Sequence, residues 1–117
     1  MVKYAINPTR TKIDRRGIMH ARATTVQIQS GKMPEVIDIM NQVVLAAKAV
    51  KGFQRGYLMT DAASGKALAI TVWESEADML AGESSSGHVP EAIAKLGSLI
   101  AGSPDIDHYE LSIDVSA

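Results

Sequence analysis

The chain has 117 residues, of which 46% are hydrophobic and 21% are charged. This length suits one domain with a single core, and this residue mixture excludes a wholly disordered chain. The absence of cysteine excludes disulfides, thiolate nucleophiles and cysteine-ligated metal sites. The net charge is only -1, but basic residues are concentrated near the N-terminus. We therefore expect a basic N-terminal extension at residues 1–18 and a folded domain at residues 19–117.

Neither nucleic acid nor a membrane is an expected partner. The basic segment has few aromatic residues for base stacking, and no recognisable nucleic-acid-binding module follows it. No apolar run approaches the roughly 18 residues that span a bilayer, and the first residues lack the apolar centre of a secretory signal. We therefore expect a soluble cytoplasmic protein.

The first predicted elements are a strand at residues 19–29 and a helix after it. Alternation predicts the strand, one face of which carries His20, Arg22, Thr24, Val26 and Ile28. Pro34 suits a first helical turn, and apolar residues at spacings of three and four predict a helix to about Val50.

A β-hairpin is predicted next, after Gly52, which suits the left-handed position at the end of a helix. Its strands are residues 53–60 and 67–73, joined by turn-forming residues. Phe53 is expected on the same face as Arg55, Tyr57 and Met59, with Leu58 opposite. The expected inner face of the other strand includes Leu68, Ile70 and Val72.

The second predicted helix begins at Ser75, which with Asp78 forms a variant of the capping box. Residues 84–87, a run of serines and a glycine, interrupt it. Pro90 can open a further helical piece to Ala101, and Gly102 with the residues after it closes that piece. The last strand is predicted at about residues 106–115.

This order of elements predicts an α+β fold of the ferredoxin-like type, βαββαβ, with a four-stranded antiparallel sheet and both helices on one face. The strands carry apolar residues on both faces. A second copy of the chain would cover the open face, so we expect a homodimer.

Two stretches are similar to a known family: Gly52-Phe53-Gln54-Arg55-Gly56, and Thr71-Val72-Trp73-Glu74-Ser75. Over about residues 19–115 the chain resembles the antibiotic biosynthesis monooxygenase (ABM) domain of the dimeric α+β barrel superfamily. The resemblance implies a dimeric barrel and, among the known activities, a cofactor-independent oxygenase that needs no metal. The three histidines likewise lack the spacing of a metal motif.

The resemblance also points to Trp73 as the best catalytic candidate. Oxygenases of this family that act on polycyclic phenols have tryptophan at this position, with asparagine four residues earlier and tyrosine six residues later. This chain has Ala69 and Met79 at those two positions. The predicted substrate-binding residues are Trp73, Thr24, Arg22, His88, Ala69 and Met79. Alternatively, Trp73 fills the junction between sheet and second helix and gives its indole N–H to a carbonyl.

Three functions follow from this sequence. The first is a monooxygenase that holds a small aromatic or apolar molecule between sheet and helices near Trp73. The second is a non-catalytic binding or interaction protein with the same fold. The third is a haem-degrading monooxygenase, in which the family's strand-one asparagine falls on Thr24 and its helical tryptophan and histidine fall on Gly82 and Ala92, with His88 one helical turn before the last.

Overall fold

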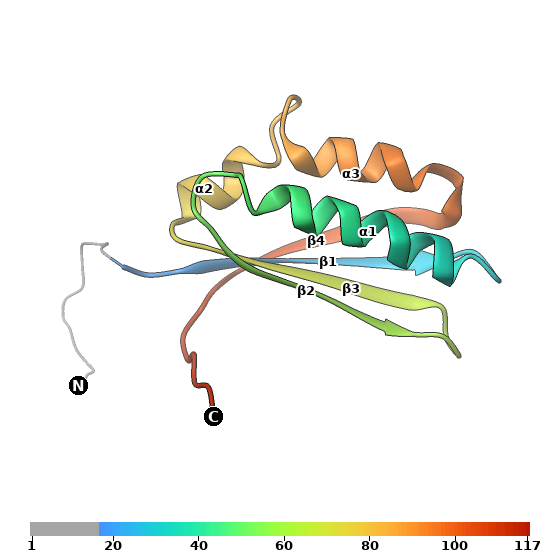
Figure 1. The fold of residues 1–117 in the computed structure, drawn as a ribbon, viewed down its shortest axis with the longest axis horizontal. Coiled ribbons are helices and arrows are strands. Elements are labelled where there is room, and N and C mark those ends of the chain that lie inside the picture. The colour runs from blue at the N-terminus through green and yellow to red at the C-terminus, as the bar shows by residue number, and fades with distance from the viewer. Residues whose placement is uncertain (1–16) are drawn as a thin grey trace.

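The computed structural model describes residues 17–117, so the predicted N-terminal extension lies almost entirely outside the described residues. The described chain forms a four-stranded sheet with helices on one side (Figure 1). The elements are β1 (His20–Ile28), α1 (Met33–Ala47), β2 (Phe53–Asp61), β3 (Lys66–Trp73), α2 (Glu76–Ala81), α3 (His88–Leu96), a 3-10 turn (Gly97–Leu99) and β4 (Ile100–Glu110). The predicted α+β class and antiparallel sheet are confirmed, with the second helical region divided into α2 and α3.

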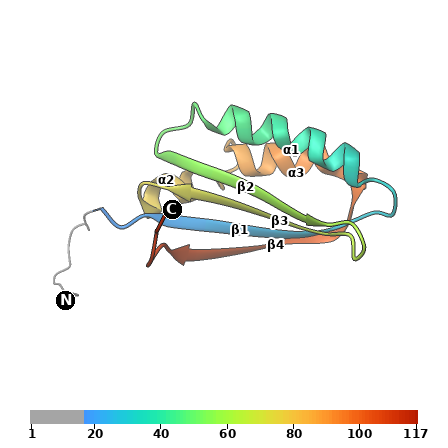
Figure 2. The same ribbon diagram turned by 60° about the horizontal axis from the view of Figure 1, so that its bottom comes forward.

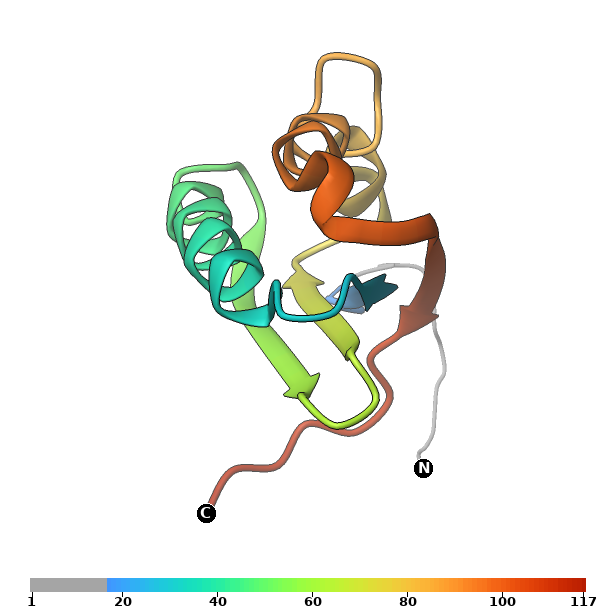
Figure 3. The ribbon, with the colours of Figure 1, turned by 90° about the vertical axis from the view of Figure 1, so that its right-hand side faces the viewer.

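The sheet has the strand order β2-β3-β1-β4, and every neighbouring pair is antiparallel. All the helices lie on the same side of it, and the other face carries no helix (Figure 2). Viewed along the sheet, α1 stands above β2 and α3 stands beside it on the side of β4 (Figure 3). Side chains of the two helices and of the sheet lie between these layers.

Two groups of buried residues hold the helices to the sheet. Ile28, Val36, Ala67 and Leu96 form a cluster that joins β1, α1, β3 and α3. At the other end of the sheet, Trp73 and Met79 are both fully buried and join β3 to α2. Burial of a large apolar side chain contributes about 1.5–3 kcal/mol. Short helices are only marginally stable by themselves, so this burial is what stabilises them against the sheet.

Local signals place the helix ends. The predicted cap at Ser75 is confirmed, since its Oγ accepts the backbone N–H of Asp78 at 3.1 Å. Pro34 lies in the first turn of α1, as predicted, but α1 ends at Ala47, before the expected Val50. Helix α3 ends at Leu96 instead of Ala101, because Gly97 adopts a positive φ of 47° that stops the helix.

The last strand is the main error of the sequence prediction. It begins at Ile100 and ends at Glu110, whereas residues 106–115 were expected. Gly102 and Pro104 are inside the strand, at a register shift opposite Thr25 and Gln27 of β1. A bulge on an edge strand tolerates both residues, because it accepts a positive φ at Gly102 and needs no N–H from Pro104.

The structure also corrects the expected faces of the hairpin. The register pairs Arg22 with Thr71 and Thr24 with Ala69, and these residues face the helices. Leu68, Ile70 and Val72 alternate with them and therefore lie on the helix-free face, not the inner one. A register shift between Phe53 and Arg55 brings Phe53 opposite Trp73, on the helix-covered side.

Candidate functional site

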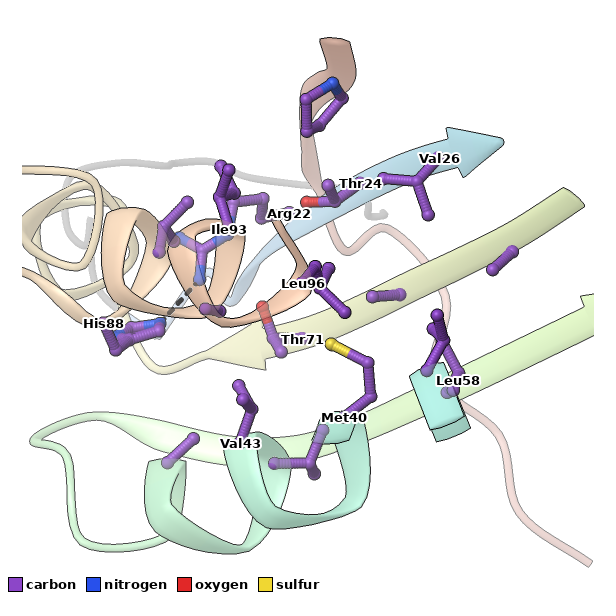
Figure 4. A pocket seen from close by; sticks show the side chains of 18 residues that line it. Arg22, Thr24, Val26, Met40, Val43, Leu58, Thr71, His88, Ile93 and Leu96 are labelled. Carbon is purple, nitrogen blue, oxygen red and sulfur yellow. Dashed lines mark hydrogen bonds between the residues drawn. The ribbon is translucent and has the colours of Figure 1, made fainter. Parts of the chain in front are cut away.

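A largely apolar cavity lies between the helix-covered face of the sheet and helices α1 and α3 (Figure 4). Its volume is about 70 Å³, several times the roughly 10–15 Å³ that one water molecule requires. Side chains from all four strands and from α1 and α3 line it, including Pro104 from the bulge of β4. The polar side chains in this lining are Arg22, Thr24, Thr71 and His88.

Arg22 is the buried charge of this site, with only 3% of the residue exposed. Its Nη1 donates to the backbone carbonyl of Met79 at 2.9 Å and to Oε2 of Glu83 at 3.3 Å. Its Nη2 lies 2.8 Å from Nε2 of His88. Burial lowers the pKa of Arg22 below its ordinary value, but a guanidinium stays protonated at neutral pH. Helix α2 and the turn that follows it thus supply partners that hold this charge beside the cavity.

His88 opens helix α3 and forms the wall next to Arg22. Because a guanidinium can only donate, Nε2 of His88 accepts from Arg22, which puts the hydrogen of the neutral ring on Nδ1. Burial lowers the pKa of His88 below its ordinary value of 6.5, and the charge of Arg22 lowers it further. Glu83 and Glu91 oppose this effect. The imidazole is therefore neutral at neutral pH.

Gly82 makes room for this imidazole. A Cβ at Gly82 would overlap the ring of His88, so the close approach of α3 to the end of α2 requires glycine here. The backbone N–H of Val89 donates to the carbonyl of Gly82 at 2.9 Å, which fixes the start of α3 against the end of α2.

Trp73 lies behind His88 and does not line the cavity. Its indole is fully buried and stacks on His88, with ring centroids 5.2 Å apart and an angle of 22° between the planes. Phe53 meets it edge to face at 5.4 Å, and the guanidinium carbon of Arg22 lies 5.6 Å from its ring. The indole N–H donates to Oγ1 of Thr71 at 2.9 Å, a hydroxyl instead of the carbonyl that was expected.

Glu83 carries the network from Arg22 to the surface. Its Oε2 contacts both Arg22 and, at 2.7 Å, Nε2 of His108 on β4. Neither Glu83 nor His108 lines the cavity. Thr71 shares the strand face of Trp73 in the alternating sequence pattern, which was a signal for a cavity-lining position, but the sequence analysis missed Glu83 and His108 as members of this cluster.

The predicted site residues fall into two groups. Arg22, Thr24, Ala69 and His88 line the cavity together, and Ala92, which the sequence analysis considered for a haem-degrading function, lines it too. Trp73 and Met79 are fully buried beside the cavity and do not reach it. The roles of all six in binding or catalysis stay predictions.

A shallow groove between α1 and α3 adjoins the cavity. Val43 and Ala47 of α1 and His88 and Ala92 of α3 line both spaces. The four side chains therefore form the partition between the cavity and the outer surface.

Within residues 17–117, no group of three or more His, Asp or Glu side chains is placed to hold a metal ion. In the same part of the chain, no helix combines the length and the apolar character that crossing a membrane requires.

Comparison with known families shows to which protein family the chain belongs. The family model for antibiotic biosynthesis monooxygenases (ABM) matches residues 19–96. This is well over half of the chain, and the chain belongs to the ABM family. The comparison with curated proteins finds no match.

Solved structures share the fold. A proposed antibiotic biosynthesis monooxygenase from Nitrosomonas europaea is 11% identical, with a TM-score of 0.72 over 86% of this chain and 97% of that one. Another, from Caulobacter crescentus, is 17% identical, with a TM-score of 0.70 over 83% and 92%. A variant of SnoaB, a cofactor-independent oxygenase from Streptomyces nogalater, is 13% identical, with a TM-score of 0.68 over 85% and 98%. At these identities the likeness concerns the fold alone.

Proposed function

We propose that this protein is a cofactor-independent monooxygenase that binds a small aromatic or apolar substrate in the cavity. The observation that carries the proposal is an apolar cavity lined by four polar groups, Arg22, Thr24, Thr71 and His88, in a chain of the ABM family. A few polar groups in an apolar cavity are what a small-molecule site requires for orientation. SnoaB, which shares the fold, is a cofactor-independent oxygenase.

The chemistry of such a reaction rests on the substrate. An anthrone-like substrate loses a proton from its activated CH2 group, and the resulting anion reduces O2. One oxygen atom enters the new carbonyl group, and the other leaves as water with the two hydrogens. The substrate is thus the reductant, and the protein's task is to bind it, stabilise its anion and exclude bulk water.

In this scheme Trp73 is a positioning residue. It does not line the cavity, but its stacked ring and its bond to Thr71 orient two side chains that do. Trp73→Phe should therefore alter the rate through His88 and Thr71. Oxygen uptake that is unchanged in Trp73→Phe would contradict a part for Trp73 in the reaction.

We also propose that the protein works as a homodimer. The helix-free sheet face carries Tyr57 and Met59 of β2 and Tyr109 of β4, each at least half exposed. An apolar face of this kind, spread over several strands, is typical of an interface between subunits. A second copy of the chain would cover it.

Oxygen consumption tests the proposed activity. The purified protein, with a metal chelator present, should consume O2 with anthrone above the rate of autoxidation. Ala92→Leu, which fills the cavity, should abolish this excess, whereas Ala94→Leu, on the exposed side of α3, should keep it. Uptake no faster than autoxidation, or equal uptake in both variants, would contradict the proposal.

A non-catalytic binding protein is the second candidate, because Ala69 and Met79 supply neither amide nor phenol. It would bind ligand in the cavity without oxygen uptake. A haem-degrading function suits the residues poorly, since Nε2 of His88 already accepts from Arg22 and Nδ1 lies beside Gly82. A haem titration without a shift of the Soret band would dispose of it.

A further inference from the structure

The charge in the cavity lining comes from one residue. Arg22 is the single formally charged side chain among the residues that line the cavity, and no carboxylate is among them. Glu83 neutralises part of this charge, but it contacts Nη1 from outside the lining and shares its Oε2 with His108. A ligand in the cavity therefore meets a guanidinium with no acidic side chain beside it in the wall.

Part of this guanidinium has no partner within residues 17–117. Of its five N–H groups, two on Nη1 and one on Nη2 bond to Met79, Glu83 and His88. The Nε–H and the second Nη2–H have no acceptor among residues 17–117. Buried donors normally have partners, so these two favour an acceptor that the chain itself does not provide. Arg22 is also almost fully buried, so its charge has lost most of its contact with water, and an anion in the cavity would add a favourable interaction.

Two hydroxyls extend the same set of donors. Thr71 pairs with Arg22 across β1 and β3, and its Oγ1 already accepts the indole N–H of Trp73, so its own hydrogen is left to donate. Thr24 follows Arg22 on the same face of β1, and its hydroxyl bonds to no other described residue. Figure 4 shows both threonines at the cavity with Arg22.

The lining offers no base to match these donors. The lone pair of neutral His88, on Nε2, is occupied by Arg22, and the lining has no carboxylate, lysine or tyrosine. A substrate that needs a strong protein base to lose its proton is therefore poorly served here. The site would instead bind and stabilise the anion of a substrate that is acidic enough to ionise by itself, or that ionises with the help of a neighbouring positive charge.

We propose that the cavity recognises an anion: an apolar, ring-bearing molecule with one carboxylate, phenolate or enolate oxygen placed against Arg22 and the hydroxyls of Thr24 and Thr71. This inference rests on the proposed function in one respect, namely that the cavity is the ligand site. It specifies the charge of the ligand, which the family and the fold leave open.

Benzoate and benzamide test this inference, because they have the same shape and differ in charge. Binding of each to the full chain at pH 7.5 is followed by chemical shifts in 1H–15N NMR spectra. Benzoate should bind at least about tenfold more tightly than benzamide, and the shifts should centre on residues that line the cavity. Equal affinities, binding of neither probe, or shifts elsewhere would overturn the proposal.

Two variants assign the preference to the proposed donors. Arg22→Met is made together with Glu83→Gln, so that the partly buried carboxylate of Glu83 is not left without its partner, and the double substitution should abolish the preference for benzoate. Thr24→Val keeps the shape and all described hydrogen bonds, and it should weaken benzoate binding more than benzamide binding, because a hydrogen bond to a charged acceptor is the stronger one. A preference that survives in the Arg22→Met, Glu83→Gln protein would contradict the role of Arg22.

The outcome is separable from that of the oxygen assay. A preference for benzoate without oxygen uptake would reject the monooxygenase and keep the anion site. Oxygen uptake with equal affinities for the two probes would keep the monooxygenase and reject the anion site.

Discussion

Nη2 of Arg22 lies 2.8 Å from Nε2 of His88, and the two residues are 66 positions apart in the chain. This contact joins the central strand β1 to the first turn of α3 at the edge of the cavity. It fixes the tautomer of His88, and the ring of Trp73 stacked behind it fixes the orientation.

Gly82→Ala should displace His88. The backbone at Gly82 is helical, with φ of -69°, so alanine is not strained there and only the overlap with the imidazole matters. We expect a loss of about 1–3 kcal/mol in the free energy of unfolding, as for other overpacked sites. Denaturant unfolding measures it. In a His88→Ala background the same substitution should cost much less, and an equal cost there would contradict the overlap.

Thr71→Val should destabilise the fold by leaving the indole N–H of Trp73 without its acceptor. An unsatisfied buried donor costs about 1–3 kcal/mol. Thr71→Ser keeps the hydroxyl and should lose clearly less. Thr25→Val, on the helix-free face of the sheet, is the matched control. Thermal unfolding ranks the three, and equal losses in Thr71→Val and Thr25→Val would argue against the hydrogen bond.

Stability should fall as the pH drops through about 6.5. The pKa of His88 is lowered in the folded state by burial and by Arg22, while in the unfolded chain it returns to about 6.5. Between these two pKa values the unfolded chain binds more protons, so acid favours unfolding, and the effect levels off below the folded pKa. Urea titrations from pH 8 to pH 5 measure this loss. His88→Phe should show a smaller loss, and NMR titration of the His88 ring should give a pKa below 6.5.

Met59→Lys should weaken the proposed dimer. Met59 is 50% exposed on the helix-free face, and a second copy of the chain would desolvate a lysine placed there. We expect the dissociation constant to rise at least about tenfold, equivalent to about 1.4 kcal/mol. Leu45→Lys is the control, because Leu45 is 56% exposed on α1. Sedimentation equilibrium compares them, and a wild-type monomer or equal effects would refute this interface.

The sequence was informative wherever a signal is local. Alternation places β1 and the hairpin, Pro34 marks the first turn of α1, and Ser75 caps α2 with its own hydroxyl. These features depend on backbone geometry within a few residues, which the local sequence controls. The order of the elements, and with it the α+β fold, follows from such signals.

Tertiary structure decided what depends on distant neighbours. Gly102 and the residues after it were predicted to follow the end of a helix. Instead, pairing with β1 makes Gly102 and Pro104 part of a bulge in β4, and Pro104 lines the cavity. The inner face of β3 could not be chosen from its sequence, because both faces are apolar enough to be buried. The inner face is the one that the helices cover, and it carries the smaller residues Ala67, Ala69 and Thr71.

The candidate site, too, was predicted only in part from the sequence. Its residue types were evident from the sequence, since a lone tryptophan and a few polar residues stand out among aliphatic ones. The contacts between these residues were not evident from the sequence. The sequence contains no signal that Arg22 bonds to His88, that Trp73 stands behind the cavity instead of inside it, or that Glu83 links Arg22 to His108. Such contacts form only when separate elements pack, because the free energy that holds them comes from burial across the whole core and not from the chain near any one residue.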